Sequence, residues 1–355
     1  MSHKDDEFPI DQELEAPLKT VRYPGFDLDI IAMELVTEAK LVDGKAVIKL
    51  RPVAAPPQVR EQLENDIAAA VRRAIGVAEV ELHLPQPTPP KEKRGPRPIP
   101  GVKWVVPVAS GKGGVGKSTL AVNLAVGLKT LGLSVGILDL DLYGPSIPLM
   151  LGASKARPGA AGDMIAPVEA HGLKVMSVGF LIGSGKALIW RGPLVMKAVR
   201  QLLHEVAWAP LDALVLDLPP GTGDVQITMA QEVPISGAVV VTTPQDVALL
   251  DAVKGVDMFK SVGAPVLGIV ENMSYFACPD CGSRHEIFGH GSVEPLCARL
   301  GVPYLGEIPL DPVVRRLADQ GQPAVEAGQE QAQPYLDLAR KVLASLQQGA
   351  SAQVH

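Results

Sequence analysis

The chain reads Gly111-Lys112-Gly113-Gly114-Val115-Gly116-Lys117-Ser118-Thr119, and this stretch decides its fold. It fits the G-x-x-x-x-G-K-[ST] pattern, in which glycines let several backbone N–H groups converge on one phosphate. The apolar run Trp104–Ala109 precedes it and the helix-competent run Leu120–Leu131 follows it, so a bare glycine turn is the weaker interpretation. We therefore predict that all nine residues bind ATP, that Lys117 neutralises the terminal phosphates and that the Ser118 hydroxyl ligates Mg²⁺.

Composition limits the classes of protein to consider. The chain has 355 residues, 47% hydrophobic and 20% charged, which is typical of a globular protein long enough for two domains. A formal net charge of -6 argues against nonspecific nucleic-acid binding, which needs a positive field. Three cysteines are too few for a secreted disulfide framework, and neither a signal peptide nor a membrane-length apolar run is present. We expect a cytoplasmic protein that binds no nucleic acid and no membrane.

The chain divides at the proline-rich, basic stretch 85–100, which predicts an extended linker. Residues 1–84 predict a small α+β domain after a disordered start at 1–6. Its expected elements are a short helix within 11–22, a hairpin of 38–42 and 46–50, a helix from 56–57 to Gly76, and a strand at 80–84. Residues 101–348 then form the ATPase domain, and 349–355 are predicted to be a disordered tail.

From Val102 onward, short apolar runs alternate with helix-length segments. This pattern predicts an α/β fold with a mostly parallel sheet covered by helices on both faces. The expected strands are 104–109, 134–139, 173–178, 213–218, 238–242, 266–270 and 304–308. Because Pro107 has no N–H for a ladder, we expect a local irregularity in the first strand. Catalytic groups should lie beyond the carboxyl ends of these strands.

Two acidic strand ends complete the predicted NTPase site. Asp139-Leu140-Asp141 closes one strand, and Asp217 closes another before a glycine-rich loop. A carboxylate at a strand tip holds Mg²⁺ through water, a role assigned to Asp217, and a second one, Asp141, orients the attacking water. Gly221 and Gly223 would offer N–H groups to the γ-phosphate, which makes this loop a switch. The alternative is that the acidic residues are helix N-caps.

Cys278-Pro279-Asp280-Cys281-Gly282 places two thiols in one turn. Two thiols supply half of a tetrahedral site, and two copies of the chain at a two-fold axis would supply Cys₄ for a bridging [4Fe–4S] cluster or for Zn²⁺. A redox dithiol and a structural turn remain as alternatives. Cys297 lies in an apolar helical run and is predicted to be core. His285 and His290 follow the cysteines, and the sequence assigns them no role.

Lys112 is not required by an ordinary phosphate loop. With it, the stretch resembles the deviant Walker A ATPases, the superfamily of MinD, ParA and the nitrogenase iron protein. That resemblance implies that Lys112 reaches across a homodimer to the partner's phosphates, as an arginine finger does. Hydrolysis of ATP to ADP and phosphate would then depend on the dimer.

Further segments resemble one branch of this superfamily, the Mrp/ApbC-type iron–sulfur cluster carrier ATPases. The resemblance covers about residues 103–321 and rests, besides Cys278 and Cys281, on the segments 141–148, 217–224, 271–275 and 306–311. It implies a homodimer that holds a bridging [4Fe–4S] cluster, receives it from cluster assembly factors and passes it to apo-proteins, with slow ATPase activity. It also implies that Asn272 lies near the adenine.

The N-terminal segment is similar to the small MIP18-like domain, but it has no cysteine. Binding of a client or partner is therefore its expected role. The alternative function for the whole chain is a positioning or partition switch of the MinD/ParA kind. A membrane-targeting switch needs a basic amphipathic terminal helix. Residues 334–348 contain only Arg340 and Lys341 as cations and predict a helix packed on the core.

Overall fold

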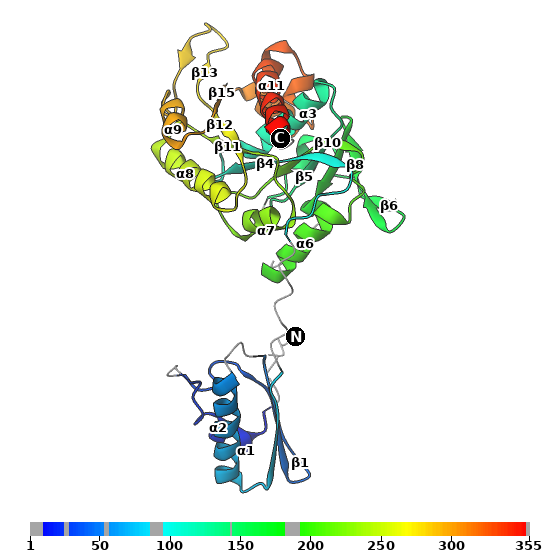
Figure 1. Cartoon of the computed structure of the whole chain (residues 1–355). Coiled ribbons are helices and arrows are strands. Elements are labelled where there is room, and N and C mark those ends of the chain that lie inside the picture. Colours follow the sequence, from blue (N-terminus) through cyan, green and yellow to red (C-terminus); the bar gives the residue numbers. More distant parts are fainter. Residues whose placement is uncertain are drawn as a thin grey trace. The chain divides into compact units, whose positions relative to one another are not determined.

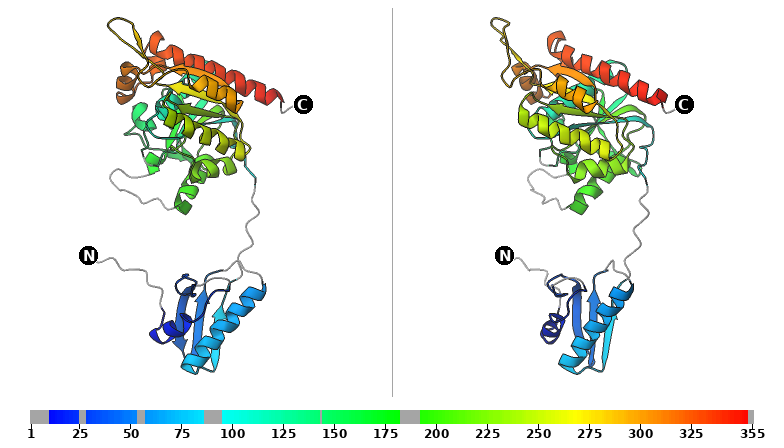
Figure 2. Two further views of the ribbon diagram at one scale, coloured as in Figure 1. Left: turned by 90° about the vertical axis from the view of Figure 1, so that its left-hand side faces the viewer. Right: turned by 60° about the vertical axis from the view of Figure 1, so that its left-hand side comes forward.

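The structure is a computed structural model that describes residues 10–24, 28–52, 57–85, 95–142, 144–181 and 192–352. Its contacts divide the chain into two compact units, Met1–Arg94 and Gly95–His355, each considered by itself below (Figures 1 and 2). The expected disorder at 1–6 lies outside the described residues.

The linker predicted at 85–100 ends earlier than expected, at about residue 94. The N–H of Arg97 donates to the Glu232 carbonyl at 2.8 Å, and Ile99 is only 3% exposed. Burial of the apolar Ile99 side chain stabilises its place in the second unit. Residues 97–99 therefore belong to that unit. Residues 86–94 lie outside the described residues.

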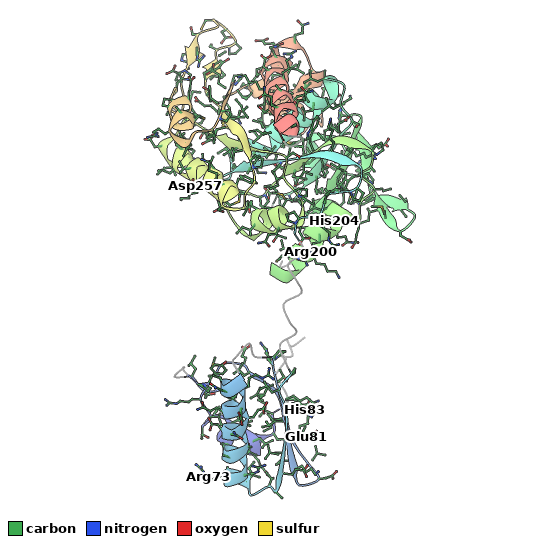
Figure 3. The ribbon with its side chains drawn as sticks, in the orientation of Figure 1. Arg73, Glu81, His83, Arg200, His204 and Asp257 are labelled. Carbon is green, nitrogen blue, oxygen red and sulfur yellow. The ribbon has the colours of Figure 1, made fainter. Side chains whose placement is uncertain are left out.

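The N-terminal unit is the expected small α+β domain. Its elements are α1 (Gln12–Leu18), β1 (Val36–Val42), β2 (Lys45–Leu50), α2 (Pro57–Ile75) and β3 (Glu79–His83). The hairpin is confirmed: β1 and β2 are antiparallel, and β3 pairs parallel to β2 after the crossover helix α2. In α2, Leu63, Ile67 and Val71 are buried in the core of this unit, whereas the charged Glu81 and His83 of β3 are half exposed (Figure 3).

The second unit is built on one sheet of eight strands in the order β15-β12-β11-β4-β10-β5-β9-β8. Every neighbouring pair is parallel except β8 and β9. The strands are β4 (Val102–Ser110), β5 (Val135–Asp139), β8 (Val168–Ala170), β9 (Leu173–Ser177), β10 (Leu211–Asp217), β11 (Ala238–Thr242), β12 (Val266–Asn272) and β15 (Tyr304–Ile308). All seven predicted strands are present, and the short edge strand β8 was not foreseen.

Helices cover both faces of this sheet, as predicted (Figure 1). One face carries α3 (Lys117–Thr130) and α11 (Gln329–Ala352), and the other carries α6 (Gly192–His204), α7 (Asp224–Glu232), α8 (Asp246–Ser261) and α9 (Val293–Leu300). Smaller elements are α4 (Ile147–Met150), α5 (Val178–Leu181), α10 (Pro312–Asp319), η1 (Ala324–Glu326) and the two-stranded pairs β6 (Gly159–Ala161) with β7 (Met164–Ala166) and β13 (Phe276–Ala277) with β14 (Arg284–His285).

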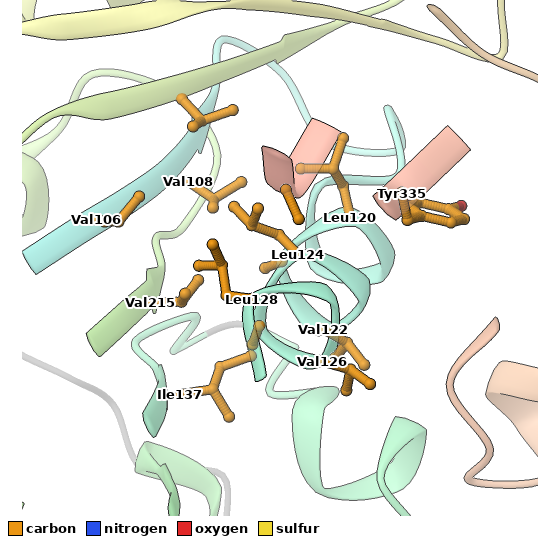
Figure 4. Packing of buried hydrophobic residues seen from close by; sticks show 14 of the residues in the cluster. Val106, Val108, Leu120, Val122, Leu124, Val126, Leu128, Ile137, Val215 and Tyr335 are labelled. Carbon is orange, nitrogen blue, oxygen red and sulfur yellow. The ribbon is translucent and has the colours of Figure 1, made fainter. Parts of the chain in front are cut away.

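Strand β4 shows why a fully covered sheet needs continuous apolar runs. Val106 and Val108 point toward α3 and meet Leu124 there (Figure 4), whereas Val105 and Ala109 join the core on the opposite face. Successive side chains of a strand point to opposite faces, so both sets must be apolar when both faces are buried. The phosphate-loop strand thereby lies in the middle of the core.

The irregularity expected at Pro107 is absent. Pro107 pairs in register with Leu216 of β10, without a shift along β4. Val105, two residues earlier, exchanges hydrogen bonds with Ser236 on the β11 side, so the missing N–H of Pro107 also faces that side. Strand β11 begins to pair with β4 only at Val108. The proline therefore sits just before the ladder that it would have interrupted.

The C-terminal helix α11 is longer than expected. It continues to Ala352, which corrects the disordered tail predicted from residue 349, since glutamine and alanine readily extend a helix that has already formed. Residues 353–355 lie outside the described residues. Tyr335, Leu338 and Val342 are buried against α3, so α11 is a core helix. None of the helices within the described ranges combines the length and apolarity that a bilayer crossing requires.

Replacing Leu124 by alanine tests the packing of α3 on the sheet. Leu124 is fully buried, so Leu124→Ala should lower the free energy of unfolding by about 2–5 kcal/mol through lost contacts and a cavity. Leu149→Ala is the control, because Leu149 is 53% exposed and should change stability by less than about 0.5 kcal/mol. Urea denaturation measures both, and equal effects would contradict the described core.

Candidate functional site

The phosphate loop connects the end of β4 to the start of α3, and its shape depends on tight packing. Gly114 and Gly116 both adopt a φ of +80°, in the left-handed region that glycine enters without strain. A Cβ on Gly111 would lie 2.4 Å from the carbonyl oxygen of Asp251, so α8 packs directly on the loop backbone. The turn therefore leads into the N-terminus of α3 as the predicted anion site requires, and phosphate binding there stays a prediction.

Asn272 supports the loop from the end of β12. Its side-chain Nδ2 donates to the Val115 carbonyl at 2.7 Å, and a Cβ on Gly116 would lie 2.2 Å from that nitrogen. With only 7% of its surface exposed, Asn272 fixes the position of the loop relative to β12. Sequence reasoning did not find this contact. The adenine contact that the family resemblance implies stays a prediction.

Three of the four charged residues predicted for catalysis, Lys117, Asp141 and Asp217, converge at the carboxyl edge of the sheet, whereas Lys112 does not join them. The Lys117 ammonium lies 2.5 Å from Asp217 Oδ1, 3.7 Å from Asp141 Oδ2 and 3.3 Å from the Ser118 hydroxyl. Burial raises the pKa of Asp217, and the Lys117 ammonium opposes that shift. These side chains thus lie within hydrogen-bond or ion-pair distance of Lys117, at the start of α3.

One oxygen of Asp217 points to a missing ligand. Asp217 is fully buried, and within the described part of the chain its Oδ2 has no hydrogen-bond partner. Such an orphaned acceptor costs free energy unless a cation or water satisfies it. A carboxylate oxygen beside the Ser118 hydroxyl is a ligand set that Mg²⁺ prefers. The residues present therefore fit the expected magnesium ion.

Asp139 is a buried carboxyl that sequence reasoning did not assign. It accepts hydrogen bonds from the N–H groups of Asp141 at 3.0 Å and Ile147 at 3.2 Å and from the Ser177 hydroxyl at 3.0 Å. Burial, together with the nearby charge of Asp217, raises the pKa of Asp139 to about 7. It shapes the loop that carries Asp141. Its position as the last residue of an apolar strand was the signal available in the sequence.

The glycine loop after Asp217 differs from expectation in one respect. The N–H of Gly221, which we expected at a γ-phosphate, donates to the Ser110 carbonyl at 2.8 Å. The buried side-chain amide of Gln226 also donates to the carbonyls of Pro219 and Gly221, at 2.7 Å and 2.9 Å. A role for Gly221 toward a phosphate requires its bond to Ser110 to break first.

Lys112 is held away from the phosphate site of its own chain. Its Nζ donates to the side-chain oxygen of Gln245, 3.0 Å away, at the start of α8. Gln245 was not singled out from the sequence, because only the fold brings it to the phosphate loop.

Cys278 and Cys281 lie in the turn of the β13–β14 hairpin. The N–H of Cys278 donates to the Ser283 carbonyl at 2.9 Å, and the N–H of Gly282 donates to the Cys278 carbonyl at 2.8 Å. Cys281 is exposed and its sulfur lies 3.2 Å from the Ser283 hydroxyl. Hydrogen bonds from the hydroxyl and N–H of Ser283, and then from Cys278, lower the pKa of the Cys281 thiol.

The two thiols would supply half of the predicted metal site. Nowhere in the described ranges do three or more His, Cys, Asp or Glu side chains converge as a metal site. Cys297 is 2% exposed in the core of α9, as predicted, and burial raises the pKa of its thiol to about 11. His285 lies beside Phe276 in the hairpin, and His290 contacts Ser274 and Arg284 instead of the cysteines.

Known proteins resemble both units. A family model described as NUBPL iron-transfer P-loop NTPase matches residues 101–343, and one described as iron–sulfur cluster assembly protein matches residues 11–82. An iron–sulfur cluster carrier protein of Deinococcus radiodurans is 45% identical over 315 residues, 88% of each chain. One of Escherichia coli is 47% identical over 290 residues, 81% of this chain and 79% of that one.

Solved structures support the same fold. The nucleotide-binding protein of Archaeoglobus fulgidus in complex with ADP has a TM-score of 0.56 and 40% identity, over 62% of this chain and 88% of that one. The cell division ATPase MinD of Pyrococcus furiosus has a TM-score of 0.52 and 24% identity, over 68% of this chain and 98% of that one, so it shares the fold alone.

Replacing Ser283 by alanine tests the environment of Cys281. Ser283→Ala removes the hydroxyl that stabilises the thiolate, so the pKa of Cys281 should rise and its alkylation by iodoacetamide should need a higher pH. Mass spectrometry of the modified peptide gives the rate at each pH. Ser261→Ala is the control, since the Ser261 hydroxyl donates to the Met258 carbonyl on α8. An unchanged pH profile in Ser283→Ala would contradict the assigned contact.

Proposed function

The chain belongs to the NUBPL iron-transfer P-loop NTPases, and on that premise we propose that it binds and hydrolyses ATP and carries an iron–sulfur cluster to apo-proteins. The observation that carries the proposal is the exposed hairpin that presents Cys278 and Cys281 from the body of a P-loop NTPase. This chain aligns with most of the length of relatives that are named iron–sulfur cluster carrier proteins. The cluster is the cargo, and the two thiols are its ligands.

We propose further that the carrier works as a homodimer with a [4Fe–4S] cluster between the subunits. Two thiolates satisfy half of the four positions of such a cluster. The described residues near the hairpin offer no third ligand, and a second copy at a two-fold axis supplies the missing pair. Zn²⁺ accepts the same Cys₄ set, so metal analysis must separate the two.

The proposed hydrolysis uses the residues at the carboxyl edge of the sheet. Lys117 and the N-terminus of α3 bind the phosphates, Asp141 orients the attacking water, and Ser118 and Asp217 hold Mg²⁺, Asp217 through water. When bound, Mg²⁺ neutralises charge on the phosphate oxygens. Lys112 of each subunit leaves Gln245 and reaches the phosphates of the partner, so turnover is slow and depends on the dimer.

The N-terminal unit is proposed to bind clients or cluster assembly factors. It matches the model described as iron–sulfur cluster assembly protein but has no cysteine of its own. Since free thiols such as Cys278 and Cys281 persist in a reducing compartment, we also propose that the protein acts in the cytoplasm.

A positioning or partition switch is the less supported function. The likeness to MinD extends to the fold alone. Helix α11, which a membrane-targeting switch would use as a free amphipathic helix, buries Leu338, Val342 and Leu346 in the core instead.

Anaerobic reconstitution with iron and sulfide tests the cargo. The wild-type chain should take up about four iron and four sulfide per dimer, and should run as a dimer by size exclusion with light scattering. Cys278→Ala and Cys281→Ala should each lose the cluster because a half-site loses a ligand. Cys297→Ala is the matched control and should keep the cluster, because Cys297 lies on α9 and is only 2% exposed. A Cys281→Ala protein that retains the cluster would refute the assignment.

The two loop lysines should separate binding from turnover. Lys117→Ala should abolish ATP binding measured by calorimetry, because its ammonium is the main charge facing the phosphates. Lys112→Ala should bind ATP normally but lose turnover by about 10³-fold, as expected for a residue that acts like an arginine finger. Lys129→Ala, on the distal end of α3, should change neither quantity. Full turnover in Lys112→Ala would contradict the shared active site.

A further inference from the structure

A polar cluster lies at the root of the cysteine hairpin and is not used by the proposed hydrolysis or by cluster binding. Its members come from the ends of β12 and β15, from the hairpin and from the loop after it: Glu271, Ser274, Arg284, His290 and Glu307, here called the hinge cluster. Ser274 is fully buried and Glu271 is 1% exposed. The Ser274 hydroxyl lies 2.7 Å from a Glu271 oxygen, 3.1 Å from a Glu307 oxygen and 3.2 Å from His290 Nδ1. Two carboxylates thus meet at one hydroxyl.

Arg284 ties the hairpin to this cluster. Its guanidinium donates to both oxygens of Glu307, at 3.1 Å and 3.0 Å, and stacks 3.8 Å from the ring centre of Tyr275. A bidentate arginine–carboxylate pair fixes orientation as well as distance. Arg284 directly follows Ser283, which contacts Cys281, and pairs across the hairpin with Ala277, which precedes Cys278. The position of the arginine therefore sets the position of both thiols.

The other end of the same segment touches the phosphate loop. Asn272, two residues before Ser274, donates to the Val115 carbonyl. Met273 between them has a φ of +54°, a conformation that a non-glycine residue keeps only when its surroundings hold it there. The N–H of Ser274 donates to the Ile308 carbonyl at 3.1 Å, so the segment is also attached to β15.

We propose that the segment Asn272–Ser274 and the hinge cluster link the nucleotide site to the cysteine hairpin, so that ATP at the phosphate loop changes the placement and reactivity of Cys281. The physical basis is that Ser274 and Glu271 are buried, and buried polar groups are stable only when they keep their hydrogen-bond partners. A shift of Val115 that moves Asn272 must therefore be followed by Ser274, Glu307 and Arg284. The inference rests on the proposed function in one respect, namely that the hairpin is the cluster site.

Thiol reactivity in the cluster-free, full-length protein tests the link. Alkylation of Cys281 by iodoacetamide is followed by mass spectrometry under anaerobic conditions, with and without Mg²⁺ and a non-hydrolysable ATP analogue. In the wild-type protein, saturation with the analogue should change the Cys281 rate about fivefold or more, in the range of coupling between sites in one protein. Cys297 in the same sample reports any global opening of the fold, because it is only 2% exposed.

Variants distinguish a link from a mere anchor. Glu307→Gln keeps the shape of the side chain but removes the negative charge that holds Arg284. Arg284→Gln removes the guanidinium that pairs with Glu307, and it does so at a partly exposed side chain. Both should bind the analogue with wild-type affinity and retain the melting temperature within a few degrees, yet the analogue should no longer change the Cys281 rate. Arg315→Gln, which breaks the exposed Arg315–Asp319 pair of α10, is the matched control and should keep the wild-type response.

Two results would overturn the proposal. One is a wild-type protein that binds the analogue without a change in the Cys281 rate. The other is a Glu307→Gln or Arg284→Gln protein in which the analogue still changes the Cys281 alkylation rate by the wild-type factor. That result is expected if the cluster only anchors the hairpin. Reconstitution of the same samples separates the two proposals: loss of cluster binding alone counts against the carrier function, and loss of the nucleotide response alone counts against the link.

Discussion

Two glycines let the backbone of the phosphate loop come into direct contact with its neighbours, and the rest of the site depends on this closeness. At Gly111 there is no space for a Cβ because of Asp251, and at Gly116 there is none because of Asn272. Helix α8 and strand β12 therefore touch the loop itself. Through α8, Gln245 comes within reach of Lys112, and through β12 the loop is joined to the segment that leads into the cysteine hairpin. A side chain at either glycine would separate these elements.

The carboxyl edge of the sheet concentrates charge where water is excluded. Asp139 and Asp217 are both fully buried at the ends of neighbouring strands, and Lys117 is the ammonium paired with one of them. Burial in this low-dielectric site, and then the nearby charge of Asp217, raise the pKa of Asp139. A divalent cation and a polyphosphate bring both signs of charge to this edge. This charge arrangement fits the magnesium nucleotide that is proposed to bind here.

The sequence was sufficient for features that depend on local pattern. The seven strands, the flanking helices and the hairpin at Asp43 and Gly44 followed from apolar runs and turn residues. It was insufficient where the outcome depends on which strands are neighbours. The tolerance of Pro107 depends on where β11 starts to pair, and the contacts of Asn272 and Gln245 depend on the sheet order. The hinge cluster likewise joins Ser274 to Glu307 only because β12 and β15 lie side by side.

The hairpin that holds the two cysteines has only two residues in each strand and no apolar core of its own. Its turn is closed by the two backbone hydrogen bonds between Cys278 and the segment Gly282–Ser283. Such a turn opens with a much smaller free energy than the sheet beneath it, because local stability follows buried apolar contact. If the cluster is held there as proposed, it is bound at a part of the chain that has few buried apolar contacts. Hand-over to another protein then needs one turn to loosen, while the nucleotide site and the core stay folded.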